Sequence, residues 1–120
     1  MAFSDTQLQK ISESDEVRIE TRAGGRSFRT IIWIVVDEGE VFVRSVRGEK
    51  GKWYQRAVAN PEVTLHVAGA EILARAVAAT DPSSVERTSE ALSRKYKKGR
   101  SLDSMLKPEI FGTTMRLDPV

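Results

Sequence analysis

The chain has 120 residues, of which 40% are hydrophobic and 30% charged, and its net charge is +2. Length and composition predict one globular domain over residues 1–120. Cysteine is absent, which excludes disulfides, thiolate metal sites and cysteine nucleophiles. The longest apolar run, residues 31–36, is far shorter than a membrane helix of roughly 20 residues, and the N-terminus lacks the pattern of a signal peptide. We therefore predict a cytoplasmic protein with no membrane partner.

The first half of the chain predicts one helix and three antiparallel strands. We expect a helix over residues 3–13, strands over residues 16–22, 27–37 and 41–46, and tight turns at 23–26 and 37–40. Ser4 or Asp5 can cap the helix. Apolar and charged side chains alternate in the first strand, as in a strand with one buried face. The second strand is the strongest, because residues 31–36 are β-branched or aromatic without interruption.

This second strand also carries a prediction about assembly. A strand that is apolar on both faces has to be covered on both sides. In so small a domain, the second cover is either the interior of a closed barrel or another subunit. We therefore predict a homodimer. The tight hairpin to the next strand is expected to place Arg29 near Arg44 and Ser45.

The second half predicts helices around further strands. We expect a helix over residues 52–60, strands over 62–67 and 71–79, a helix from Asp81 through Lys98, a helical turn over 101–106 and a last strand over 113–117. Asp81 can cap the long helix with Pro82 in its first position, and Gly99 is expected to end it. Short strands joined by hairpin turns predict an α+β protein, mainly β, built on a small six-stranded antiparallel β-barrel with flanking helices.

The stretch from Val41 to Pro61 carries the clearest chemistry. A loop between its strand and its helix holds three basic residues and two glycines, preceded by a hydroxyl: Arg47, Lys50, Lys52, Gly48, Gly51 and Ser45. Fixed positive charge, approachable backbone N–H groups and a helix N-terminus are what a phosphate needs. The alternative is that these are surface charges paired with acidic neighbours. The balanced charge argues against the third possibility, nucleic acid.

Other candidates are weaker. Trp33 can stack on a ligand ring or belong to the core, whereas Trp53 and Tyr54 favour packing. His66 is the only histidine and has no second metal ligand at useful spacing, so no metal site and no Ser-His-Asp arrangement is predicted. The catalytic residues are unknown, with Tyr96 the best polar candidate. The basic residues 95–100 suit a solvated helix end.

Several motifs together resemble a known superfamily. They are Arg29-Thr30 opening an apolar strand, Val43-Arg44-Ser45, the run from Gly48 to Tyr54, and Asn60-Pro61-Glu62-Val63. In order and spacing they resemble the split β-barrel flavin-binding superfamily, which includes pyridoxamine 5'-phosphate oxidases and deazaflavin-dependent nitroreductases. Within it the chain is most similar to a bacterial family of unknown function, through Arg44, Ser45, Gly48, Trp53, Tyr54, Lys95, Tyr96, Arg116, Leu117 and Pro119.

The resemblance implies a six-stranded split barrel that forms a homodimer with a cofactor at the subunit interface. It implies that Arg29, Ser45 and Lys50 contact the phosphate and that residues 31–33 run beside the ring. The cofactor-binding set is then Arg29, Thr30, Ile32, Trp33, Arg44, Ser45, Arg47, Lys50 and Trp53. The implied cofactor is FMN, with deazaflavin F420 or none as alternatives.

Two functions follow as hypotheses. The first is an oxidoreductase that uses the flavin or deazaflavin to pass hydride or electrons to a small acceptor. The alternative is a non-catalytic dimeric binding module that has lost the flavin and binds another anionic ligand or none. Glu49 in the basic loop favours this alternative, because it places a negative charge beside the expected phosphate.

Overall fold

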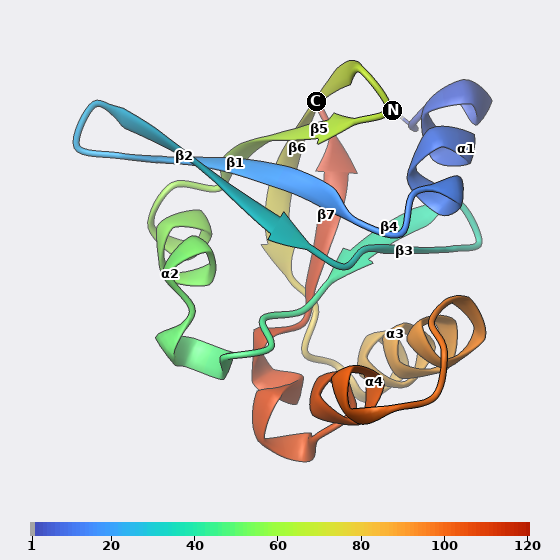
Figure 1. The fold of residues 1–120 in the computed structure, drawn as a ribbon. Coiled ribbons are helices and arrows are strands. Elements are labelled where there is room, and N and C mark those ends of the chain that lie inside the picture. The colour runs from blue at the N-terminus through green and yellow to red at the C-terminus, as the bar shows by residue number, and fades with distance from the viewer. Residues whose placement is uncertain (1) are drawn as a thin grey trace.

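The computed structural model describes residues 2–120 and shows one curled antiparallel sheet with helices around it (Figure 1). Its seven strands are β1 (Val17–Ala23), β2 (Arg26–Ile32), β3 (Val35–Asp37), β4 (Glu40–Val43), β5 (Glu62–Val67), β6 (Ala70–Ala78) and β7 (Met115–Pro119). They pair in the order β2-β1-β5-β6-β7-β4-β3. Its α-helices are α1 (Asp5–Glu13), α2 (Lys52–Ala59), α3 (Pro82–Lys95) and α4 (Arg100–Met105). The predicted α+β split-barrel class is therefore confirmed.

The count of strands differs from the predicted six because the segment expected as one strand over residues 27–37 bends. Its first half, β2, pairs with β1, and its second half, β3, pairs with β4. The two edges of the sheet are thus consecutive in sequence, so the sheet curls around on itself. At the bend, the backbone N–H and C=O of Ile34 bond to side chains of Tyr96 and Lys95.

The bend also corrects the expected place of Arg29. Arg29 lies opposite Glu20 of β1, and its Nε is 3.5 Å from Oε1 of Glu20. It was expected to face Arg44 and Ser45. That expectation was wrong, because the turn at 23–26 folds β2 back onto β1 and only the β3 half of the segment reaches β4.

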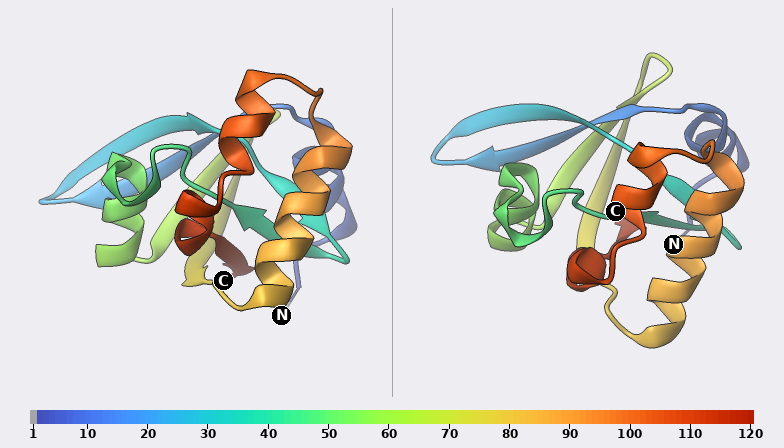
Figure 2. Two further views of the ribbon diagram at one scale, coloured as in Figure 1. Left: turned by 90° about the horizontal axis from the view of Figure 1, so that it is seen from below. Right: turned by 60° about the horizontal axis from the view of Figure 1, so that its bottom comes forward.

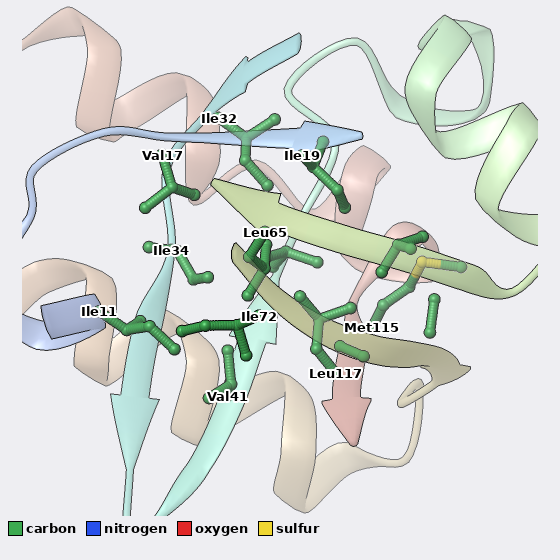
Figure 3. Packing of buried hydrophobic residues seen from close by; sticks show 14 of the residues in the cluster. Ile11, Val17, Ile19, Ile32, Ile34, Val41, Leu65, Ile72, Met115 and Leu117 are labelled. Carbon is green, nitrogen blue, oxygen red and sulfur yellow. The ribbon is translucent and has the colours of Figure 1, made fainter. Parts of the chain in front are cut away.

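The main core fills the inside of the curled sheet (Figure 3). Ile19, Leu65, Ile72, Val41 and Leu117 come from five different strands and point toward one another there. Each is at most 2% exposed. Side chains of this kind stabilise a fold by roughly 1.5–3 kcal/mol each when fully buried. Strand alternation therefore places the apolar faces inward as the sequence predicted.

A second core lies outside the sheet, under α3, which packs against β3, and α4, which packs against α3 (Figure 2). Val35 and Phe42 pack there against Leu92 of α3 and Leu102 of α4. β3 contacts α1 as well as α3. The chain's own helices are thus the second cover of the β3 half of this strand, whereas Ile31 in the β2 half is 55% exposed. The homodimer remains a prediction.

Capping residues set the helix starts largely as expected. Ser4 forms a capping box with Gln7 at the start of α1, and Asp81 accepts a hydrogen bond from the Ser84 N–H at the start of α3. α3 ends at Lys95 and does not run on to Lys98. Gly99 instead directly precedes α4. The reason is that Tyr96 leaves the helix to bond the bend at Ile34. Among residues 2–120 no helix has the length and apolarity needed to cross a membrane.

Candidate ligand-binding site

A cavity of about 540 Å³ opens where the bend of β2, the loop after β4, the start of α2 and one side of α4 meet. This volume lies within the range of roughly 300–1,000 Å³ of small-molecule sites. Its lining residues are Glu16, Thr30, Ile31, Ile32, Trp33, Arg44, Ser45, Val46, Arg47, Gly51, Lys52, Trp53, Ser101, Ser104 and Met105. The wall is mostly apolar and aromatic, and its basic residues come from the loop after β4 and the first residue of α2.

The structure brings together seven of the nine residues in the predicted cofactor-binding set. Those that line the cavity are Thr30, Ile32, Trp33, Arg44, Ser45, Arg47 and Trp53. Arg29 and Lys50 do not line it. Arg29 pairs with Glu20 on the β1 side, and Lys50 ends a short 3-10 turn with its side chain exposed. Glu49, whose charge argued for the alternative function, is also exposed and outside the lining.

The N-terminus of α2 supplies the anion-binding feature of the cavity. Gly51 is the N-cap residue, and no side chain caps this end of the helix. Lys52 and Trp53, the first two residues of α2, line the cavity together with the exposed Arg47. Unpaired N–H groups and the helix dipole favour an anion here, and the two cations add to that preference. Lys52 thus takes the place in the cavity lining that was expected for Lys50.

Ser45 shapes this loop more than it offers a ligand contact. Its side chain is buried, and Oγ donates a hydrogen bond of 2.8 Å to the carbonyl of Gly48. The backbone N–H of Ser45 donates a hydrogen bond to Oγ1 of Thr113 and not to a neighbouring strand. Strand β4 therefore ends at Val43 and does not continue to residue 46 as expected. A Cβ on Gly51 would lie 2.3 Å from the Ser45 Oγ. The loop therefore needs glycine at position 51 for close approach.

The Gly51→Ala variant tests this packing. Because the added methyl overlaps Ser45, we expect the loop to shift and stability to fall by about 1–3 kcal/mol, as in other overpacked sites. Gly112→Ala is the matched control, since a Cβ there meets nothing within 4 Å and its φ is not positive. Thermal unfolding measures both variants, and equal melting temperatures would contradict the close approach.

Arg44 is a buried hub behind the cavity, only 2% exposed. Its guanidinium donates hydrogen bonds to four neutral acceptors: Thr114 Oγ1 at 2.9 Å, and Ser89 Oγ, the Met105 carbonyl and the Val85 carbonyl at 3.0 Å each. The ring of Phe111 lies 4.7 Å from its Cζ. Burial lowers the pKa of Arg44 to about 10. The positive charge near the cavity thus faces neutral acceptors, and the side chain ties β4 to α3, α4 and the segment before β7.

Both tryptophans of the chain line the cavity. Trp33 stacks on Tyr96 with 3.8 Å between ring centroids and an interplanar angle of 3°. Trp53 is buried in the main core and meets Tyr54 edge-on at 6.3 Å. Trp33 therefore joins the second core to the cavity wall, and Trp53 joins the main core to it, so the packing expected for Trp53 and a place at the site coexist.

The structure corrects the expectations for Tyr96 and Lys95. The Tyr96 hydroxyl accepts from the Ile34 N–H at 3.1 Å and donates to the Asp15 carbonyl at 2.5 Å, and burial raises its pKa to about 12. Tyr96 does not line the cavity, and its hydroxyl is engaged with the backbone of Ile34 and Asp15. Lys95 is not at a solvated helix end, because Nζ donates to the carbonyls of Ile11 and Ile34 and burial lowers its pKa to about 8.

His66 lies apart from this cavity. Its Nε2 is 2.7 Å from Oε1 of Glu20, and Nδ1 is 3.7 Å from Oε1 of Glu71. The His66 hydrogen bond is the main reason that the pKa of Glu20 is lowered. In the described part of the chain no three potential metal ligands cluster together.

Sequence reasoning missed the contribution of α4. Ser101, Ser104 and Met105 form one side of the cavity, although they lie more than 45 residues after the basic loop. Glu16 and Val46 were missed as well. The only signal in the sequence was that Leu102 and Met105 share an apolar stripe. This stripe predicts that one side of the helix is buried, but it does not predict what the other side contacts.

Several solved structures share this fold. A candidate pyridoxamine 5'-phosphate oxidase from Listeria innocua is 17% identical with a TM-score of 0.69, over 96% of this chain and 91% of that one. An FAD binding protein from Mycobacterium smegmatis is 18% identical with a TM-score of 0.65, over 98% and 92%. The heme storage protein HutZ from Vibrio cholerae is 16% identical with a TM-score of 0.69, over 100% and 92%. This chain thus shares the split-barrel fold of these three proteins.

The family follows from a sequence match. The model of DUF2255, described as an uncharacterized protein conserved in bacteria, matches residues 7–117. The chain belongs to this family, which confirms the predicted resemblance to a bacterial family of unknown function. No curated protein matches the chain.

Proposed function

We propose that this protein binds a phosphorylated flavin, FMN or deazaflavin F420, in the cavity beside α2. The observation that carries the proposal is the uncapped N-terminus of α2, which lies at the edge of an aromatic-walled cavity with Arg47 and Lys52 next to it. A phosphate suits the helix end and the cations. A planar ring suits the wall of Trp33 and the apolar side chains around it.

The residues present fit such a group. Arg47, Lys52 and the first N–H groups of α2 would hold the phosphate, in place of the expected Arg29 and Lys50. Ile31, Ile32 and Trp33 would contact the ring. Arg44 adds a buried positive charge whose hydrogen-bond acceptors are all neutral. Glu16 at the edge opposes an anion locally, so the phosphate belongs at the α2 side.

A flavin, when bound, would supply hydride or electron transfer to a small acceptor. The chain's own residues bind and orient the ring and keep water from its apolar side. Tyr96 and Lys95 are both engaged with backbone carbonyls, so neither is available as a proton donor to a substrate. This arrangement favours an oxidoreductase in which the protein positions the group and the group performs the chemistry.

The experiment is an absorbance spectrum of the purified protein, followed by titration with FMN and with F420. Because both tryptophans line the cavity, their fluorescence reports occupancy directly. We expect a flavin band or quenching with a Kd of about 1–10 μM, since a few charge-assisted hydrogen bonds and one stacking contact exceed the ordering cost by that much. Absence of quenching by either ligand would favour the non-catalytic binding module.

Heme is the second ligand suggested by a relative's name, because HutZ is a heme storage protein. The cavity offers no histidine among its lining residues. His66, the only histidine, is hydrogen-bonded to Glu20 in a different place. A bound heme in this cavity would lack the usual imidazole ligand. Flavin therefore fits the site better.

We also propose that the protein is a homodimer whose interface includes the mouth of the cavity. Ile31 and Val46 line the cavity and are 55% and 54% exposed. Burying both against a second copy would remove apolar surface from water and close the ring side of the site. Light scattering at micromolar concentration should give twice the mass of the chain, and Ile31→Glu should give a monomer. A wild-type monomer would contradict the proposal.

A further inference from the structure

At the bend between β2 and β3, side chains make the hydrogen bonds to the backbone that a neighbouring strand would make within a sheet. Ile34 lies between the end of β2 at Ile32 and the start of β3 at Val35. Its N–H donates to the Tyr96 hydroxyl at 3.1 Å, and its carbonyl accepts from the Lys95 Nζ at 2.7 Å. Buried backbone groups have to be paired. Two consecutive residues at the end of α3 thus satisfy both backbone groups of Ile34.

The same two side chains also hold the chain before β1. Lys95 Nζ donates to the carbonyl of Ile11 in the last turn of α1 at 3.1 Å. The Tyr96 hydroxyl donates to the carbonyl of Asp15 at 2.5 Å. A cation at a helix C-terminus is favourable. The bend, α1 and the end of α3 therefore meet at one pair of residues.

This pair acts on the cavity through Trp33. Tyr96 covers one face of the Trp33 indole at 3.8 Å, nearly parallel to it. Trp33 precedes Ile34 and lines the cavity, whereas Lys95 and Tyr96 do not. Because Tyr96 covers one face of the indole, a ligand ring in the cavity can contact only the other face and the edge of Trp33. Without this stack, the indole would be free to rotate, and ligand binding would carry the entropic cost of ordering it.

We propose that Lys95 and Tyr96 are positioning residues for the ligand cavity, which fix the bend at Ile34 and hold the Trp33 indole in the cavity wall. The binding part of this proposal rests on the proposed flavin function, whereas the orientation of Trp33 does not. The ordered indole is part of the site before any ligand arrives. The pair thereby lowers the ordering cost of stacking a planar ligand.

The test compares Tyr96→Leu, Tyr96→Phe and Lys95→Met by near-ultraviolet circular dichroism and by FMN titration. Tyr96→Leu should lose most of the tryptophan dichroism and raise the FMN Kd about tenfold, because both the stack and the hydroxyl bonds are removed. Tyr96→Phe should keep the stacking signal and raise the Kd about threefold. Lys95→Met should raise the Kd by a similar factor.

Val41→Ala separates positioning from stability. Val41 is fully buried in the main core and does not line the cavity. This variant should lower the melting temperature while its dichroism and FMN Kd stay at wild-type values. Wild-type dichroism in Tyr96→Leu would overturn the proposal, as would an equal rise in Kd in Val41→Ala. If Tyr96→Leu does not fold, an unchanged Kd in both Tyr96→Phe and Lys95→Met overturns it.

The two proposals can fail separately. If wild-type protein does not bind FMN, the proposed function fails, and the dichroism of Tyr96→Leu still decides whether Tyr96 orders Trp33. If wild-type protein binds FMN and every variant binds equally, the flavin site stands and the positioning role is overturned.

Discussion

Replacing Arg44 with alanine is expected to cost about 3–5 kcal/mol of folding stability, which is a large part of the 5–15 kcal/mol of a typical domain. The truncation removes four hydrogen bonds, to Thr114, Ser89, Met105 and Val85. It also leaves a cavity where the guanidinium met Phe111. Relief of a buried charge offsets part of this loss. Urea denaturation measures the free energy of unfolding.

Two further variants sharpen this prediction. Arg44→Lys keeps the charge but has three donors in place of five and cannot reach all four acceptors, so we expect an intermediate loss of about 1–3 kcal/mol. Arg75→Ala changes an exposed arginine on β6 and should lie within about 0.5 kcal/mol of wild type. A stability of Arg44→Ala within about 1 kcal/mol of wild type would show that this hub is not structural.

The second large effect is expected at the phosphate end of the cavity. The double reversal Arg47→Glu with Lys52→Glu should weaken FMN binding about a hundredfold or more, because two attractive charges become repulsive beside the phosphate. The affinity for riboflavin, which has the ring without the phosphate, should fall by less than about threefold in the same variant. Tryptophan quenching measures both ligands on the same protein. Both side chains are exposed, so the fold should persist.

Lys97→Glu with Lys98→Glu is the matched control. These lysines are exposed, carry the same charge and lie outside the cavity lining. Their reversal changes the net charge by the same amount, and it should leave FMN affinity nearly unchanged at about 0.15 M salt, where distant charges are screened. Equal weakening by both double reversals would mean that overall charge governs binding, and it would remove the local phosphate site.

Most of the fold could be predicted from periodicity and local signals. The alternation of Val17 and Ile19 placed β1, and Asp81-Pro82 placed the start of α3. The predictions failed where a tertiary contact decided the local structure. The bend at Trp33 and Ile34 depends on Tyr96, which is 62 residues away from Ile34. No local propensity breaks a strand of six consecutive apolar residues, so the sequence predicted one long strand.

The site, too, could be predicted where it depends on local sequence and not where it depends on tertiary contacts. The loop around Ser45, Arg47 and Trp53 is local, and its composition already indicated an anion site. Arg29 was misplaced because its position depended on how the bent strand pairs. Ser101 and Ser104 were missed because their place in the cavity depends on how α4 packs, which has no local signature.

The ratio of FMN to riboflavin affinity tests the central claim most directly. Quenching of Trp33 and Trp53 would be followed in titrations of wild-type protein with each ligand. A phosphate at the N-terminus of α2 predicts that FMN binds at least about tenfold more tightly than riboflavin, since one charge-assisted hydrogen bond alone supplies that factor. Equal affinity for the two ligands, or no quenching by either, would contradict a phosphorylated flavin in this cavity.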